Sequence, residues 1–130
     1  KLKDDPVRPH ISNNHRFGGN SSVLALVENE QVRAMVCTKM CSRVPSSEAE
    51  LLTDETDEPS VIIFYTIWSY DKGAGRELIL QALEKVKQEM PTIKRYVTLS
   101  PSTEMAKRFH LNNGAEIFRV NSGSVNYEYY

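Results

Sequence analysis

The 130-residue sequence has no hydrophobic run long enough to cross a bilayer, and no signal peptide opens it. It also lacks an excess of either charge, because 16 Lys and Arg face 17 Asp and Glu, for a net charge of −1. Such a balance gives no electrostatic indication of binding to nucleic acid or to a membrane surface. We therefore predict a cytoplasmic protein with neither nucleic acid nor a membrane as a partner.

Cysteine is scarce as well, with only Cys37 and Cys41. In a strand, a spacing of four places both side chains on one face but too far apart for a disulfide. Half of a metal site is the alternative, but no second pair of Cys or His lies nearby. We predict free thiols in a reducing compartment and no metal cofactor.

Length and composition suit one domain with its own core, since 40% of the residues are hydrophobic and 25% are charged. The segment 1–20 is polar and contains two prolines and two glycines, which is typical of an irregular arm. We predict an N-terminal arm over 1–20 and a single domain over 21–130. Because the sequence begins at Lys1 rather than Met, a missing N-terminal segment is left open.

Apolar periodicity predicts the secondary structure of the domain. Alternating or continuous apolar residues predict strands at 22–28, 31–41, 61–68, 95–99, 115–120 and 124–129. Helical spacing predicts helices at 75–90 and 101–113, the second capped by Gly114. The acidic segment 44–59 is either a solvated loop or a short surface helix. The order β-β-β-α-β-α-β-β predicts an α/β or α+β fold with a mixed sheet of six to seven strands and 61–68 at its centre.

A turn with two glycines, 70–76 (YDKGAGR), joins the central strand to the first predicted helix. Glycine lets a backbone turn tightly and approach a ligand closely. The first amides of a helix lack internal partners and lie at the positive end of its dipole, so they suit a phosphate. A plain strand-to-helix turn is the alternative, because the spacing is neither that of a Walker loop nor that of a dinucleotide fingerprint. The candidate ligands are Lys72, Gly73, Ala74, Gly75 and Arg76.

The glycine turn resembles the acyl-CoA signature of the acetyl-CoA-dependent N-acetyltransferase (GNAT) superfamily. That signature is Gln or Arg, two residues, Gly, one residue, then Gly or Ala. Gly73 and Gly75 match its small positions, and Tyr70 stands at the Gln or Arg position. Residues 106–115 (AKRFHLNNGA) resemble a second motif, Ala-x-x-Phe-Tyr-x-x-x-Gly-Phe, with His110 in the Tyr position. In the superfamily this Tyr is a common general acid that protonates the departing CoA thiolate.

A narrower resemblance, over about 61–129, is to the C-terminal catalytic domain of malonyl-CoA decarboxylases. Its motifs occur in order as FYTI at 64–67, the glycine turn, TLSP at 98–101, FHLNNGA at 109–115 and VNYEY at 125–129. The proposed catalytic pair of that domain, a Ser in Leu-Ser-Pro and the His of Phe-His, corresponds to Ser100 and His110. Here only eight residues, 102–109, separate Pro101 from His110, where the decarboxylases carry a long insertion.

The resemblance implies a GNAT-like acyl-CoA N-acyltransferase fold, splayed at the ends of the strands that begin near 61 and 95. The backbone of Tyr65, Thr66 and Ile67 would bind the pantetheine arm in this splay like an added strand. The implied co-substrate is acetyl-CoA or another acyl-CoA, and the leading activity is acyl transfer to an amine acceptor of unknown identity. Malonyl-CoA decarboxylation by Ser100 and His110 is the runner-up, and a non-catalytic acyl-CoA-binding module is the third reading. Homodimer formation is left open.

Each of the two candidate catalytic residues could instead have a purely structural role. His110, with an ordinary pKa near 6.5, could protonate a thiolate or an enolate. It could instead be a cation that complements the end of a helix dipole together with Lys107 and Arg108. Ser100 could hydrogen-bond a thioester carbonyl or a carboxylate. It could instead be the N-cap of the second helix, with Pro101 as the first helical residue.

The aromatic residues beside these motifs are predicted to be structural. Tyr65, Trp68 and Tyr70 flank the glycine turn and are expected to pack on the sheet. Tyr127 and Tyr129 lie in the last predicted strand and are expected to be strand residues rather than members of the site.

Overall fold

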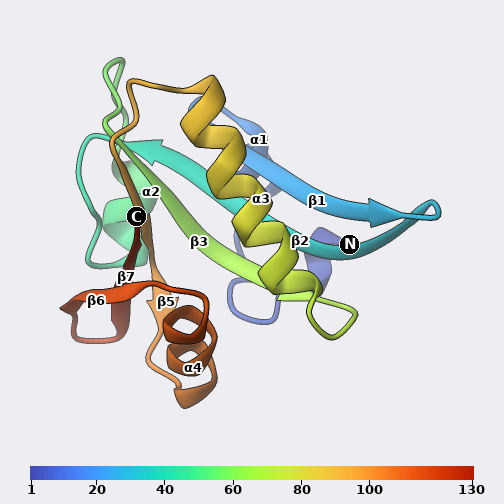
Figure 1. Ribbon diagram of the computed structural model, residues 1–130. Helices are drawn as coiled ribbons and strands as arrows, with labels where there is room; N and C mark the ends of the chain where they lie inside the picture. Colours follow the sequence, from blue (N-terminus) through green and yellow to red (C-terminus); the bar gives the residue numbers. More distant parts are fainter.

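The computed structural model describes all 130 residues, Lys1–Tyr130. It contains one mixed sheet of seven strands with helices on both faces (Figure 1). The strands are β1 (Ser21–Glu28), β2 (Gln31–Cys41), β3 (Val61–Ser69), β4 (Arg95–Thr98), β5 (Ser100–Pro101), β6 (Glu116–Val120) and β7 (Ser124–Tyr129). The helices are η1 (Leu2–Asp4), α1 (Asn13–Phe17), α2 (Glu48–Thr53), α3 (Ala74–Glu89) and α4 (Glu104–Asn112). The predicted order of strands and of the two main helices is confirmed.

The strand order in the sheet is β1-β2-β3-β4-β7-β5, and β6 pairs with the other side of β7. Only β3 and β4 are parallel, and α3 connects them. β4 and β5 follow one another along β7, with Tyr96 opposite Tyr129 and Ser100 opposite Val125. β3 is buried along 61–66, as its continuous apolar run predicted for a central strand.

Two core layers cover the two faces of the sheet. α3 packs on one face with residues at helical spacing, and Figure 1 shows it crossing in front of β1, β2 and β3. The arm, α1 and α2 lie behind the sheet in the same view and cover the other face. The buried residues of α3 are Ala74, Gly75, Leu78, Ile79, Ala82, Leu83 and Val86. β3 therefore has protein on both sides, which explains its apolar composition.

The second main helix begins later than predicted. Thr103 is its N-cap and accepts a hydrogen bond from the Ala106 amide at 3.2 Å. Ser100 and Pro101 instead form β5 against β7. The reading of Ser100 as the N-cap of this helix is therefore wrong, because pairing with β7 holds the segment extended for three further residues.

The end of α4 is fixed by Gly114, whose φ of +98° is left-handed. The Ala115 amide donates to the His110 carbonyl at 3.0 Å, and the Gly114 amide donates to the Leu111 carbonyl at 3.2 Å. This pair of bonds is a Schellman motif, and it satisfies the last carbonyls of the helix. The predicted role of Gly114 is confirmed, and the motif also fixes the backbone of His110.

The segments predicted as irregular or solvated are partly structured. The arm 1–20 contains η1 and α1, and the acidic segment 44–59 contains α2, whose Leu51 is fully buried. The two cysteines are buried free thiols, and burial raises the pKa of the Cys41 thiol to about 12. Among the helices, none combines the length and the hydrophobicity that a membrane span needs.

Candidate active site in the splay between β3 and β4

β3 and β4 pair for four residues and then separate. Phe64 and Thr98 are the last paired residues, and beyond them the Leu99 amide donates to the Phe64 carbonyl at 3.2 Å. Against β2, the register shifts between Phe64 and Thr66, which leaves Tyr65 as an extra residue on β3. A bulge of this kind bends a strand and increases its twist. The sheet therefore splays where the resemblance places the pantetheine arm.

A groove of about 710 Å³ occupies this splay. Seventeen residues line it, and none of them has a carboxylate, an ammonium or a guanidinium group. The volume is within the usual range of small-molecule sites. The predicted site residues among the lining are Tyr65, Thr66, Ile67, Gly75, Ser100 and His110. The groove thus joins the start of α3 to both candidate catalytic side chains.

The amino end of α3 is not capped by the protein itself. Gly73 is its N-cap with a φ of +83°, and no side chain accepts a hydrogen bond from the first turn. The Ala74 amide donates to the Asp71 carbonyl at 3.2 Å, whereas the amides of Gly75 and Arg76 have no acceptor within the chain. Unpaired amides at the positive end of a sixteen-residue helix form a suitable anion site.

The charged residues of the turn are engaged differently from one another. Lys72 is exposed and makes no hydrogen bond or ion pair. Arg76 donates from Nη1 to the Asn112 carbonyl at 3.2 Å and to Asn113 Oδ1 at 2.8 Å. It therefore ties the start of α3 to the end of α4. A ligand role for Arg76 stays a prediction, and it would require the side chain to share or leave these contacts.

His110 is buried in α4, with 4% of its surface exposed. Its Nδ1 lies 2.7 Å from the Tyr129 hydroxyl, and its ring stacks on Tyr127 with centroids 5.0 Å apart. Burial lowers the pKa of His110 to about 4, so the imidazole is neutral at pH 7. The alternative reading of His110 as a cation at the helix end is therefore wrong. Its Nε2 has no partner and is not fully buried, and the residue lines the groove.

Ser100 lines the groove from β5 and is 4% exposed. Its hydroxyl hydrogen-bonds the Thr98 hydroxyl at 2.7 Å, and Thr98 Oγ1 accepts from the Tyr127 amide at 3.1 Å. This chain of contacts starts from the backbone of β7 and fixes the rotamer of Ser100. The structure thus brings Ser100 and His110 to one groove, whose walls are β5 and α4.

No protein-family model matches the sequence, and a search of curated proteins gives no match. Solved structures do resemble the chain. A malonyl-CoA decarboxylase from Cupriavidus metallidurans has a TM-score of 0.73 at 16% identity, over 88% of this chain and 54% of that chain. One from Agrobacterium vitis has a TM-score of 0.67 at 21% identity, over 81% and 30%. The GNAT domain of S. lividans PAT has a TM-score of 0.63 at 20% identity, over 93% and 70%.

The chain has the GNAT fold. This confirms the predicted fold class and, at the level of architecture, the likeness to both acetyltransferases and malonyl-CoA decarboxylases. The chain spans between 30% and 54% of the length of three malonyl-CoA decarboxylase structures among those that it matches.

Within this GNAT fold, the arm contributes a site residue that no sequence motif marks. The Arg8 guanidinium donates to the Tyr65 carbonyl on β3 and, at 3.0 Å, to the Leu99 carbonyl on the opposite lip of the splay. Its Nε pairs with Glu48 at 3.0 Å. Arg8 therefore bridges the two separated strands, and it occupies the Tyr65 carbonyl that the resemblance assigns to the coenzyme.

A buried carboxylate holds the arm in place. Asp5 is 2% exposed and accepts hydrogen bonds from two amides of the arm, from the Thr66 hydroxyl at 2.9 Å and from Arg16 at 3.0 Å. Burial raises the pKa of Asp5, but these hydrogen bonds outweigh it and the net pKa is lowered. Between Asp5 and Arg8, Pro6 and Val7 line the groove. The arm is therefore one wall of the site.

Proposed function

We propose that the protein binds an acyl-coenzyme A and activates its thioester carbonyl with His110 and Ser100. One observation carries the proposal: a single groove runs from the uncapped start of α3 to both of these side chains. The diphosphate would bind the amides of residues 72–76. The pantetheine arm would lie in the apolar groove, and the thioester would reach the end formed by β5 and α4.

Decarboxylation of a malonyl-type thioester is the reaction for which the residues that line the groove are best suited. Loss of CO2 breaks a carbon–carbon bond, and its electron pair becomes an enolate whose oxygen carries the charge. That oxygen needs hydrogen-bond donors, which His110 Nε2 and the Ser100 hydroxyl would provide. The Ser100 and Thr98 hydroxyls can each donate or accept, so Thr98 can donate to Ser100 and free the Ser100 hydrogen for the substrate. A solvent proton then adds to the carbon and gives the acetyl thioester.

Acyl transfer to an amine is the second candidate, because the same two donors would stabilise its tetrahedral intermediate. This reaction also needs a base, since most amines are protonated at neutral pH. The lining residues include no carboxylate, and His110 with a pKa of about 4 is a weak base. An amine acceptor would therefore have to enter the groove already neutral.

The reactions are separated by their products. Incubation with malonyl-CoA should yield acetyl-CoA, which chromatography and mass spectrometry detect. Release of free CoA thiol only when acetyl-CoA and an amine are both present would favour transfer instead. Binding of acyl-CoA without either product would favour the non-catalytic module.

A glycine variant tests the coenzyme site itself. Gly73→Val places a β-branched side chain at a φ of +83°, at the amides that would hold the diphosphate. We expect its affinity for CoA to fall by about tenfold or more, because a displaced turn no longer aims its amides at the anion. Gly19→Val is the matched control, since Gly19 has a φ of +58° but lies outside the groove. Equal CoA affinity in the two variants would contradict the proposal.

A further inference from the structure

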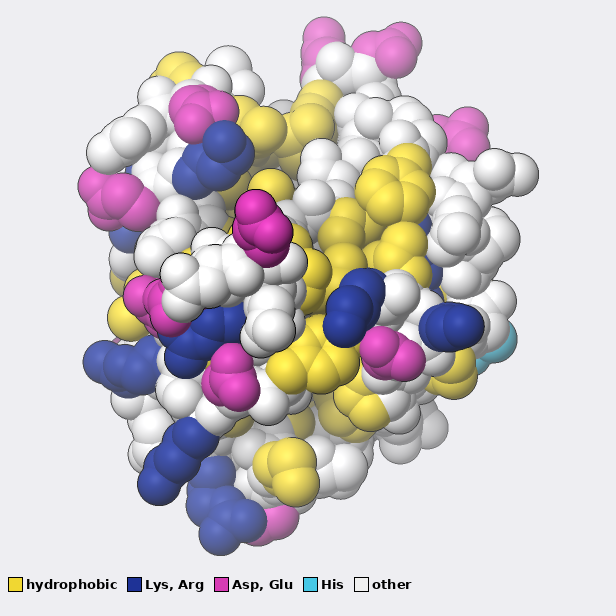
Figure 2. Space-filling model, turned by 90° about the vertical axis from the view of Figure 1, so that its right-hand side faces the viewer, with side chains coloured by type: hydrophobic (Ala, Val, Ile, Leu, Met, Phe, Trp, Pro, Cys, Tyr) yellow, Lys and Arg dark blue, Asp and Glu magenta, His cyan; other side chains and the backbone are white.

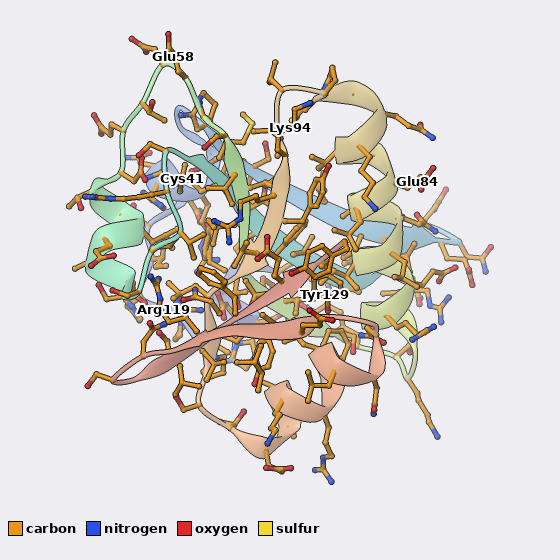
Figure 3. All side chains as sticks on the ribbon, turned by 60° about the vertical axis from the view of Figure 1, so that its left-hand side comes forward. Cys41, Glu58, Glu84, Lys94, Arg119 and Tyr129 are labelled. Atoms are coloured by element: carbon orange, nitrogen blue, oxygen red, sulfur yellow. The ribbon has the colours of Figure 1, made fainter.

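The contact between His110 and Tyr129 joins α4 to β7 across nineteen residues of sequence. Tyr129 is 3% exposed, and Figure 3 shows it near the centre of the molecule, whereas Glu58, Glu84 and Lys94 lie at its periphery. Strand pairing opposite Tyr96 fixes its backbone. A buried phenol on a rigid strand is thus aimed at the ring of a candidate catalytic residue.

The direction of this hydrogen bond follows from the donors present. A neutral imidazole has one N–H group and one bare nitrogen. A buried phenol keeps its proton, because burial raises the pKa of the Tyr129 hydroxyl, and it needs an acceptor. The Asn113 side chain, whose Oδ1 accepts from Arg76, faces this hydroxyl as a donor, so the acceptor is His110 Nδ1 at 2.7 Å. Tyr129 therefore donates to Nδ1, and the ring proton of His110 lies on Nε2.

The neighbouring rings fix the orientation of the imidazole. Tyr127 stacks on it with an interplanar angle of 27°, and Phe109 contacts it edge-on at 82°. A rotation out of the ring plane would break the stacking, and a half-turn flip would break the hydrogen bond to Tyr129. The Nε2–H group therefore stays on the side of the ring that is not fully buried, where His110 lines the groove.

We infer that Tyr129 is a positioning residue that holds His110 as the Nε2–H tautomer, so that His110 presents a hydrogen-bond donor to the acyl group. The effect of Tyr129 on catalysis rests on the proposed function, whereas the tautomer of His110 does not depend on it. The opposite tautomer would aim a lone pair at the carbonyl oxygen and oppose the developing negative charge. His110 in this account is a fixed neutral donor rather than the proton shuttle that its ordinary pKa suggests.

Nitrogen-15 NMR of the His110 ring tests the tautomer directly, in the folded protein at pH 7. Wild-type protein should show a protonated Nε2 and a bare, hydrogen-bonded Nδ1. Tyr129→Phe should populate both tautomers, while Tyr96→Phe should leave the wild-type pattern. Tyr96 is the matched control because it is a partly buried tyrosine paired with Tyr129, and its hydroxyl contacts the Ile93 carbonyl instead. A protonated Nδ1 in the wild type, or an unchanged tautomer in Tyr129→Phe, would overturn the inference.

Turnover tests the catalytic consequence separately. With the thioester that proves to be the substrate, Tyr129→Phe should lower kcat by about tenfold and leave KM nearly unchanged, the loss expected for one hydrogen bond that acts in the transition state. Tyr96→Phe should retain the wild-type kcat. If NMR shows the expected tautomers but no thioester is turned over, the proposed function fails and the positioning role stands. If kcat falls equally in both variants, the role of Tyr129 is merely structural.

Discussion

The burial of His110 predicts that the folded state loses stability as the pH falls. Its pKa is about 4 in the folded chain, against an ordinary value of 6.5 when unfolded. Between these values the unfolded chain binds more protons, so acid favours unfolding. The contribution of neutral His110 to the free energy of unfolding is therefore fully present above about pH 6.5 and is lost as the pH falls towards 4. From the two pKa values, the free energy of unfolding should fall by roughly 2 kcal/mol at pH 5 and by about 3 kcal/mol near pH 4.

Urea unfolding of the wild type and of His110→Asn at pH 8 and pH 5 measures this contribution. Asn keeps an oxygen that can accept from Tyr129, but it does not titrate. Other groups also respond to acid, since the pKa values of Asp5 and His15 are lowered too. These groups are present in both proteins and cancel in the comparison. Between pH 8 and pH 5, the free energy of unfolding of the wild type should fall by about 2 kcal/mol more than that of the variant.

If the two proteins lose the same free energy of unfolding between pH 8 and pH 5, His110 titrates alike in the folded and unfolded chains. Its ring would then be solvated, and a neutral donor at the groove would be excluded. An NMR titration that places the pKa of His110 near its ordinary value would lead to the same conclusion.

Three further predictions concern the arm, the groove and the thiols. Arg8→Ala should lower the free energy of unfolding by about 3 kcal/mol, because it leaves two carbonyls without their donor and removes one of the two partners of the Glu48 carboxylate, and urea unfolding measures the loss. Gly75→Val should weaken acyl-CoA binding, because even a Cβ would lie 3.4 Å from the Phe109 ring and the larger side chain must displace this wall of the groove, and calorimetry measures the affinity. Cys37 and Cys41 should react with a thiol reagent only on unfolding, because both are buried and burial raises both pKa values.

The parts of the fold with strong local patterns were predictable. The apolar run of β3 and the helical spacing of α3 each determine burial from a few adjacent residues, and both elements form as predicted. The start of α4 was not predictable in this way. Ser100 and Pro101 have the pattern of a helix start, but pairing with β7, more than twenty residues later, outweighs it.

The site was predictable only where motifs marked it. Ser100 and His110 were identified by resemblance, and they do line one groove. Arg8 and Tyr129 were not identified, because their roles depend on partners that lie far away in the sequence. Arg8 contacts carbonyls 57 and 91 positions later, and charged residues in a polar segment usually indicate solvent exposure. No local period distinguishes a tyrosine that packs from one that also orients a histidine.

Backbone amide NMR during titration with acetyl-CoA tests the central claim most directly. If the diphosphate binds the open amino end of α3, the amides of Gly73, Gly75 and Arg76 should shift most, with those of Ile67 and His110 following along the groove. Shifts confined to other surfaces, or none at millimolar coenzyme, would contradict the account.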